Sequence, residues 1–444
     1  MLRMPIKRLA ELIGCMATGN GREIVGMTHD TRSIEPGNLF CALKGEHADG
    51  HDFVARAAEA GAGAALVTRV VDVDLPQLVV GDVLAAMGQI AFAWREQMPV
   101  TVIGITGSNG KTTVKEMLAA MLERSGATLA TRGNYNNEIG VPLTLSRLTA
   151  EHRFAVIEMG ASSSGDIAYL CDIARPEIGI VTNAASAHLE GFGSLDGVAR
   201  TKGEMFESLA PSGLAVINAD DSYSGLWHEL ASHCRTITFG AGESAMVRGS
   251  MEKGRVHVST PIGEFDYLPR LPGRHNMMNA LAATAAAVTL DLTLSDITAA
   301  LGALESIPGR LQVHRHAEGW SLIDDTYNAN PASLYAGLQV LAEEGGERWL
   351  VLGDMAELGS DSAKLHAEMG QVAADMGISR LFAVGKLSQN SAQAFGAGAT
   401  HYEHQDALVL ALRDNLHAGV SCLVKGSRSM HMERIVQSLV GEMA

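Results

Sequence analysis

The sequence predicts an α/β protein with three domains, and three observations support this prediction. At 444 residues the chain exceeds the length at which a single hydrophobic core keeps growing. Short continuous apolar runs alternate with helix-like segments, which favours parallel sheets covered by helices on both faces. At residues 101–113, the apolar run "TVIGIT" enters the glycine-rich turn "GSNGKTT", which is typical of a P-loop.

The first predicted domain covers residues 1–97. Between about Phe40 and Glu96, the apolar runs "LFCAL", "AALVT" and "LVV" alternate with helical segments such as "HDFVARAAEAGA". This pattern indicates a small α/β unit. The domain boundary is placed where Pro99 interrupts a helix just before the next strand.

The central predicted domain covers residues 98–312 and the third covers residues 313–444. In the central domain, "FAVIEM", "IGIVTN", "LAVINAD" and "TITFG" are runs of the buried-strand type, and "RHNMMNALAATAAAVTL" predicts a long helix. Residues 246–267 alternate more regularly and contain glycine turns, which predicts a small antiparallel patch. The α/β pattern restarts in the third domain with "WSLIDDT", "RWLVLGD", "RLFAVG" and "SCLVKG".

Composition narrows the classes of function. The formal net charge of -16 argues against a general nucleic-acid binder, because nothing would offset phosphate repulsion. The five cysteines form no CxxC pair, which indicates reduced thiols rather than a disulfide framework or a zinc site. The first residues lack the continuous apolar core of a signal peptide, and no apolar run reaches membrane-spanning length. We therefore expect a cytoplasmic protein that does not insert into a membrane.

The glycine-rich turn predicts a phosphate-binding loop. Gly107 and Gly110 allow backbone N–H groups to converge on phosphate oxygens at the positive end of the following helix. Lys111 is placed to reach the outer phosphates, and the hydroxyl of Thr112 to hold a magnesium ion. The strict pattern has glycine where this chain has Ile105, so the loop is a variant form.

Three further residues of the central domain are candidate site residues, and each also has an ordinary structural explanation. Glu158 ends an apolar strand and is placed to reach magnesium, although an acidic residue at a strand end is usually only solvated. His188 follows another strand, where a lone loop histidine is more often structural. Lys202 in "VARTKGEMF" has the context of a routine lysine on a helix surface.

The segment "LIDDTYNANPASL" concentrates polar residues at one strand end. Asp324 and Asp325 close the strand, Pro331 is placed where a helix begins, and Asn328 and Asn330 lie between them. A turn with a helix cap would explain some of these residues, but four polar side chains exceed what a cap requires. Additional cations that could face an anionic intermediate, or be solvated surface residues, are Arg310, Lys425 and Arg428.

Taken together and in order, these segments resemble the ATP-dependent Mur ligases of bacterial peptidoglycan synthesis. The resemblance extends over essentially the whole chain, and its fold would be a P-loop parallel-sheet ATPase domain between a substrate-binding α/β domain and a Rossmann-like C-terminal domain. It is carried by "DTRSIEPGNLFCALKGEHADGHDF", "GITGSNGKTT", "GNYNNEIGVPLTL", "EMGASSSGDI", "TNAASAHLEGFGS", "TKGEMF", "GRHNMMNALAA", "PGRLQ", "DDTYNANPASL", "GDMAELG" and "KGSRSM".

The resemblance implies a ligase reaction between two small-molecule substrates. ATP would phosphorylate the terminal carboxylate of a UDP-N-acetylmuramoyl-tripeptide, and the amine of D-alanyl-D-alanine would displace the phosphate to give the pentapeptide precursor. The third domain would close over ATP and bind the incoming dipeptide. Because two anions must meet, cations have to offset both charges. We also expect a monomer without nucleic-acid partners.

The resemblance also assigns residue roles. The catalytic residues would be Lys111, Lys202, His188 and Arg310. ATP would contact Gly107, Ser108, Asn109, Gly110, Lys111, Thr112, Thr113, His275, Asn279, Arg310, Asp325, Tyr327 and Asn328. One Mg²⁺ would bind Thr112 and Glu158, and a second would bind His188 and a carbamylated Lys202. The nucleotide-linked substrate would contact Thr31, Arg32, Asn134, Asn136 and Asn137.

Other functions remain open at this stage. Sibling ligases that add another amino acid and the folylpolyglutamate synthetases share the architecture, although the first domain disfavours the folate enzymes. A P-loop switch or motor would hydrolyse nucleotide without peptide substrates, but the chain has no Asn-Lys-x-Asp guanine-reading motif. An inactive binding module would have little reason to keep Lys111, Thr112, Glu158, His188 and Lys202 together.

Overall fold

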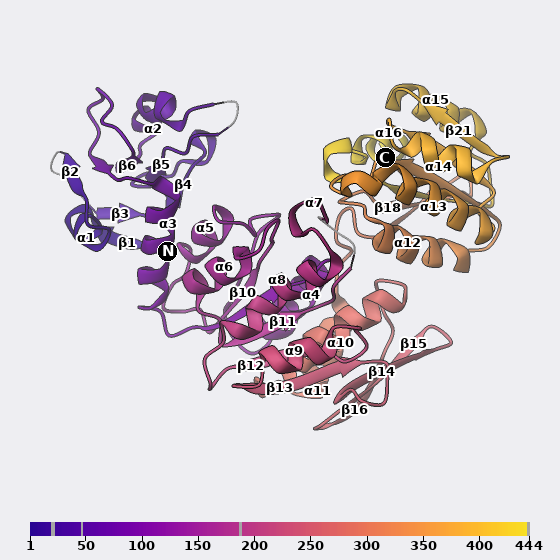
Figure 1. Cartoon of the computed structure of the whole chain (residues 1–444), viewed down its shortest axis with the longest axis horizontal. Coiled ribbons are helices and arrows are strands. Elements are labelled where there is room, and N and C mark those ends of the chain that lie inside the picture. The colour runs from indigo at the N-terminus through magenta and orange to yellow at the C-terminus, as the bar shows by residue number, and fades with distance from the viewer. Residues whose placement is uncertain (19–22, 46–47, 186–188, 442–444) are drawn as a thin grey trace.

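The computed structural model describes residues 1–18, 23–45, 48–185 and 189–441. Within them the strands form sheets of five, nine and six strands and one two-stranded ribbon. Figure 1 shows three α/β units, with the central one between the indigo N-terminal unit and the orange and yellow C-terminal unit. The predicted α/β class is confirmed, and the domain boundaries at residues 97 and 312 stay predictions.

The first sheet has the order β2-β7-β6-β5-β4, and it is parallel except at β2. Its strands are β2 (Met16–Thr18), β4 (Met27–Thr28), β5 (Leu39–Cys41), β6 (Ala64–Val67) and β7 (Gln77–Val79). The ribbon β1 (Arg3–Pro5) and β3 (Glu23–Val25) and the helices α1 (Ile6–Leu12), α2 (Val54–Glu59) and α3 (Val83–Arg95) complete this unit. Apolar residues of this unit and of the central unit form one continuous core, so the two are packed together.

The central sheet has the order β16-β15-β14-β13-β12-β11-β8-β10-β9, parallel from β9 to β14. The predicted antiparallel patch is confirmed as β14 to β16, which extend this sheet. The strands are β8 (Thr101–Thr106), β9 (Thr128–Ala130), β10 (Phe154–Glu158), β11 (Ile178–Val181), β12 (Leu214–Asn218), β13 (Arg235–Gly240), β14 (Val247–Glu252), β15 (Arg255–Thr260) and β16 (Gly263–Tyr267).

Helices cover both faces of the central sheet, which explains its continuous apolar strands. In β10, Ala155 and Ile157 join one apolar core, while Phe154 and Val156 join the other. One face packs against α3, α5 (Gly140–Leu145), α6 (Asp166–Ala174), α8 (Leu195–Glu207) and α9 (Ser224–Leu230). The other packs against α4 (Lys111–Leu122), the long predicted helix α10 (Arg274–Val288) and α11 (Leu294–Ala303). The short helix α7 (Leu189–Phe192) precedes α8.

The third sheet has the order β17-β18-β22-β19-β20-β21, and it is parallel except at β17. Its strands are β17 (Gln312–Arg315), β18 (Ser321–Asp325), β19 (Glu347–Gly353), β20 (Arg380–Val384), β21 (Ala399–Tyr402) and β22 (Val420–Lys425). One face is covered by α12 (Pro331–Glu343), α13 (Ser362–Asp375) and α14 (Ser388–Phe395), and the other by α15 (Gln405–Asn415) and α16 (Glu433–Val440). Its two cores are separate from those of the central unit.

Two expectations from composition concern the whole fold. All five cysteines are free thiols. Among the residues that the structure describes, no helix combines the length and apolar character needed to cross a membrane.

Candidate active site

The phosphate-binding loop lies between β8 and α4. Gly110 precedes the helix with a φ of 82°, and Gly107 has a φ of 142°, backbone conformations that favour glycine. A Cβ atom at Gly107 would overlap the Thr182 hydroxyl, and one at Gly110 would overlap the Asn279 side chain. Both glycines are therefore required by close packing as well as by conformation.

The loop is held in place by residues that follow β11. The backbone N–H groups of Ser108 and Asn109 donate to the carbonyl and the side-chain oxygen of Asn183, each at 3.0 Å. The Thr182 hydroxyl donates to the Asn109 carbonyl at 2.6 Å. Of this segment, only His188 was predicted as a site residue; Thr182 and Asn183 were not, although "IVTN" continues an apolar strand directly. His188 lies outside the described residues.

Lys111 lies back across its own loop. Its Nζ donates to the Gly107 carbonyl at 2.8 Å and so lies beside the predicted phosphate site. Burial lowers the pKa of Lys111, with Arg310 acting in the same direction, while the carboxylate of Glu158 opposes the change. The amine therefore lies close to one negative and one positive side chain of the predicted site.

Glu158, Thr112 and Arg310 converge on the same region. Glu158 is 1% exposed; its Oε1 accepts from Asn136 Nδ2 at 2.8 Å, while its buried Oε2 has no hydrogen-bond partner among the described residues. Arg310 donates through Nη2 to the Thr112 hydroxyl at 3.3 Å and stacks 4.1 Å over the ring of Tyr327. Its buried Nε also lacks an acceptor in the described part of the chain. An unpaired carboxylate oxygen and an unpaired guanidinium N–H suit a cation and an anion, respectively.

The structure corrects the interpretation of Lys202 as a routine surface lysine. Its side chain on α8 is 2% exposed, and its Nζ lies 5.1 Å from the ring centre of Phe192. Burial, together with the charge of Lys111, lowers the pKa of Lys202 to about 7. No sequence pattern indicated this burial, because polar residues of α8 lie on both sides of Lys202.

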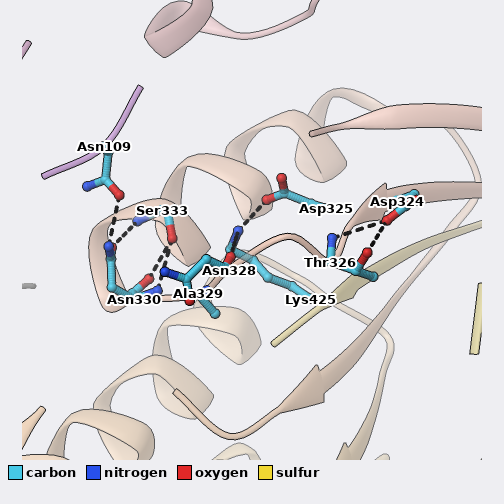
Figure 2. Close-up of polar contacts among 9 residues, drawn as sticks. All are labelled: Asn109, Asp324, Asp325, Thr326, Asn328, Ala329, Asn330, Ser333 and Lys425. Atoms are coloured by element: carbon cyan, nitrogen blue, oxygen red, sulfur yellow. Dashed lines mark hydrogen bonds and ion pairs between the residues drawn. The ribbon is translucent and has the colours of Figure 1, made fainter. Parts of the chain in front are cut away.

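After β18, Pro331 begins a helix as predicted, and Asn330 makes a contact in addition to the helix cap. Pro331 begins α12, and Asn330 caps it by accepting from Ser333 N at 2.9 Å. The Nδ2 of Asn330 then donates to the side chain of Asn109 in the phosphate-binding loop at 2.8 Å, as Figure 2 shows. Asn330 therefore joins the third unit to the central one across 221 positions of sequence.

The two aspartates of this segment have different partners. Asp325 forms a buried ion pair with Lys425, its register partner on β22, and Lys425 also donates to the Asn328 carbonyl at 3.0 Å (Figure 2). Asp324 instead accepts from the backbone and hydroxyl of Thr326, at 3.1 and 2.6 Å, within its own turn. Lys425 is thus a buried structural cation and not a solvated one.

Two cavities meet at the phosphate-binding loop. A first cavity of 310 Å³ is lined by Ser108, Asn109, Gly110, Lys111, Thr112, Asn134, Asn136, Asn137, Glu158, Arg310, Tyr327, Asn328, Asp166 and Arg428, among others. A second cavity of 280 Å³ is lined by Asn109, Gly110, Thr113, Thr182, Asn183, His275, Asn279, Arg310, Asp325 and Lys425, among others. Both cavities include side chains of the central and of the third unit, so their shape depends on how these units meet.

His275 enters the second cavity from the start of α10. Burial lowers its pKa to about 4, against the opposing effect of Asp325, so the imidazole is neutral at physiological pH. Asn279, one turn further along α10, is 7% exposed and contacts the phosphate-binding loop at Gly110. Both residues therefore line the second cavity, and their contact with the base of ATP stays a prediction.

Thr31 and Arg32 line neither of these two cavities. They lie in a short 3₁₀ helix, Thr31–Ser33, and Arg32 forms an exposed ion pair with Asp30 at 2.6 Å. The adjacent His29 packs edge-on against Tyr135 at 6.5 Å between ring centres. This contact places the first unit beside the segment that carries the predicted asparagines.

Comparison with known proteins identifies the family. Three family models match: "Mur ligase family, catalytic domain" over residues 23–107, "Mur ligase middle domain" over 105–287 and "Mur ligase, glutamate ligase domain" over 309–428. The chain is 44% identical to the UDP-N-acetylmuramoyl-tripeptide–D-alanyl-D-alanine ligase of Escherichia coli K12, with 99% of each chain covered.

Solved structures agree with the sequence comparison. A crystal structure of MurF from Acinetobacter baumannii superposes with a TM-score of 0.92 at 34% identity, covering 99% of both chains. The MurF ligase of Thermotoga maritima in complex with ADP superposes with a TM-score of 0.84 at 28% identity, covering 94% of this chain and 97% of that one. By sequence and by fold, the chain belongs to the Mur ligase family.

Proposed function

We propose that this chain is an ATP-dependent ligase that joins D-alanyl-D-alanine to a UDP-N-acetylmuramoyl-tripeptide and so forms the cytoplasmic pentapeptide precursor of peptidoglycan. The observation that carries the proposal is the phosphate-binding loop, which lines both cavities through Asn109 and Gly110. A nucleotide in the second cavity can therefore present its terminal phosphate to an acid in the first. The names of the relatives, which match over nearly the full chain, support this choice of substrates.

The reaction has two steps that balance without another co-reactant. The tripeptide carboxylate attacks the terminal phosphorus of ATP, which releases ADP and leaves an acyl phosphate. The neutral amine of the dipeptide then attacks the acyl carbon, the carbon–oxygen bond to phosphate breaks, and the amine proton is lost. The first step brings two negative charges together and the second releases a charged phosphate, and the first cavity has Lys111 and Arg310 in its lining to offset these charges.

The second cavity provides the features needed for a nucleotide. His275 and Asn279 enter it from α10, while Asp325 and Lys425 enter it from the third sheet. Because the imidazole of His275 is neutral, it can exchange hydrogen bonds with an uncharged base or sugar. We therefore place the nucleoside here and its phosphates at the helix end, against Lys111.

Magnesium fits the residues at the junction of the cavities. Thr112 and Glu158 would hold one ion, since the buried Oε2 of Glu158 has no partner among the described residues. Mg²⁺ would offset phosphate charge as a Lewis acid. Within the described ranges, no three His, Cys, Asp or Glu side chains cluster closely enough to hold a metal, so ATP oxygens and water would complete the coordination.

A second ion would bind His188 and a carbamylated Lys202. Carbamylation requires a neutral amine, which attacks carbon dioxide and loses a proton to give an anionic oxygen ligand. A pKa of about 7 leaves a large fraction of Lys202 neutral near physiological pH. The burial of this amine, which has a positively charged neighbour in Lys111, supports the modification.

Closure of the third domain over the nucleotide completes the proposal. We place the domains at residues 1–97, 98–312 and 313–444, and the separate cores of the third unit support a rigid-body movement. Closure would exclude water, which otherwise hydrolyses an acyl phosphate. We expect the Asn134, Asn136 and Asn137 segment to contact the tripeptide substrate, Thr31 and Arg32 to contact its uridine diphosphate end, and the enzyme to be a monomer.

Phosphate release tests the function directly. ATP and Mg²⁺ are supplied with each peptide substrate alone and then with both, and the product is identified by mass. We expect stoichiometric release of phosphate and formation of pentapeptide only when both substrates are present. Equal release with neither substrate would instead support a nucleotide-driven switch.

A further inference from the structure

A second lysine of the P-loop helix is buried, and the proposed chemistry does not use it. Lys115 lies one helical turn after Lys111 and is 1% exposed. Its Nζ donates to the Thr131 carbonyl at 2.7 Å and forms an ion pair with Glu116 at 2.7 Å. An apolar side chain of similar length would avoid the cost of taking an ammonium group out of water. The charge therefore needs an explanation other than packing.

Thr131, which accepts the hydrogen bond of Lys115, makes a second hydrogen bond through its hydroxyl. Thr131 directly follows β9 and is 2% exposed. Its carbonyl accepts from Lys115, while its hydroxyl accepts from the backbone N–H of Glu158 at 3.0 Å. One residue thus connects the P-loop helix to the backbone of the candidate metal ligand.

The connection continues into the lining of the first cavity. Asn136, five residues after Thr131, donates to Glu158 Oε1 at 2.8 Å, and its carbonyl accepts from Gly160 N at 2.7 Å. The segment from residue 131 to 137 is therefore held at its start by Thr131 and further along by Asn136. Asn134, Asn136 and Asn137 of this segment all line the cavity.

We propose that Lys115 is a positioning residue that, through Thr131, fixes Glu158 and the wall formed by residues 131–137 relative to the P-loop helix. ATP, the phosphate donor, would bind at the first turn of α4, and the tripeptide carboxylate that accepts the phosphate would lie against residues 131–137. A charged hydrogen bond from the same helix, one turn later, keeps the two at a constant separation. The consequence for ligation rests on the proposed function, whereas the positioning itself does not.

The test compares four variants of the full chain. Lys115→Met removes the ammonium group at similar length, and Lys115→Arg retains a charged donor. Thr131→Val removes the hydroxyl that accepts from Glu158 but keeps the carbonyl that binds Lys115. Leu118→Ala is the matched control, since Leu118 is fully buried on the same helix and its truncation weakens packing without removing this polar connection.

Amide hydrogen exchange is the first measurement. We expect faster exchange in peptides covering residues 157–160, by about 10- to 100-fold for Lys115→Met, which loses a hydrogen bond from a charged group, and by about two- to tenfold for Thr131→Val, which loses a neutral one. Lys115→Arg should restore most of the protection. The control should leave these peptides unchanged relative to the rest of the central sheet. Equal protection in Lys115→Met and the wild type, or an equal loss in the control, would overturn the proposal.

ADP binding with and without Mg²⁺ is the second measurement, made by calorimetry. Mg²⁺ should tighten ADP binding in the wild type and in the control, and it should lose about 10-fold or more of this effect in Lys115→Met. Binding without Mg²⁺ should change by less than about twofold, because the loop amides are untouched. If Mg²⁺ acts equally in all variants, or has no effect in the wild type, the inference is wrong. Because neither measurement contains a peptide substrate, failure of the ligase assay would be a separate result.

Discussion

The hydrogen bond between Asn330 and Asn109 gives a prediction about how nucleotide binding depends on the contact between the units. Asn330 has two tasks that can be separated, since its side-chain oxygen caps α12 and its Nδ2 donates to Asn109 at 2.8 Å. Asn330→Ser keeps a capping oxygen on a shorter side chain and removes the donor to Asn109. Asn330→Ala removes both.

The expected magnitudes follow from these two tasks. Loss of a neutral hydrogen bond costs about 0.5–1.5 kcal/mol, so Asn330→Ser should weaken ADP binding by about two- to tenfold. The second cavity has lining residues from both sides of this contact, which is why the loss should appear in affinity. Asn330→Ala should weaken binding similarly and should also lower the free energy of unfolding of the third unit by about 1 kcal/mol, the contribution of an N-cap.

Calorimetry with ADP and urea unfolding of the same proteins measure the two effects. Trp320 and Trp349 are buried in the third unit, so its unfolding changes their fluorescence, whereas Trp94 and Trp227 belong to the core of the other two units. ADP binding by Asn330→Ser within a factor of about 1.5 of the wild type would refute the role of the contact. Equal unfolding free energies for the two variants would refute the separate role of the cap.

Three further predictions concern the loop and its candidate ligands. Glu158→Gln keeps the shape of the side chain but removes the charge, so ligation should fall by at least about 100-fold while Mg²⁺-free ADP binding stays constant; an unchanged turnover number would contradict the metal role. Carbon dioxide reacts only with the neutral amine of Lys202, whose pKa is about 7, so bicarbonate should stimulate the activity of CO₂-depleted enzyme increasingly as the pH rises through 7. Lys202→Met should abolish this stimulation. ¹³C NMR with labelled bicarbonate detects the carbamate, and absence of its signal at pH 8 would exclude the modification. Gly110→Ala combines a φ of 82° with overlap of Asn279, so KM for ATP should rise at least about tenfold. Gly254→Ala, with a φ of 75° but in open space between β14 and β15, should leave KM for ATP unchanged, and equal effects would contradict the packing argument.

Much of the fold could be predicted because its signals are local. The strands of the central sheet are buried on both faces, and this produces the continuous apolar runs from which they were predicted. The glycines of the phosphate-binding loop and Pro331 at the start of α12 follow from backbone conformation, which a residue type reveals directly. The edge strands β9, β17 and β21 are short and partly exposed, so their sequences lack a strong periodic signal.

The candidate site was predicted where a motif carries it and missed where only packing does. Lys111, Thr112 and Glu158 lie at the carboxyl ends of neighbouring strands, as parallel pairing requires. The support of the loop by Thr182 and Asn183 and the burial of Lys202 were not predicted. No local pattern distinguishes a buried lysine on a polar helix from an exposed one, since burial there depends on elements distant in sequence.

The sequence by itself determined the α/β class, the phosphate-binding loop and the family, because periodicity, glycine positions and ordered motifs are properties of neighbouring residues. Only the tertiary structure decided that Lys115 reaches Thr131, that Asp325 pairs with Lys425 and that Asn330 meets Asn109. The last two contacts join residues 100 and 221 positions apart. Their partners are chosen by strand order and by the meeting of separate units, and a linear pattern does not contain that information.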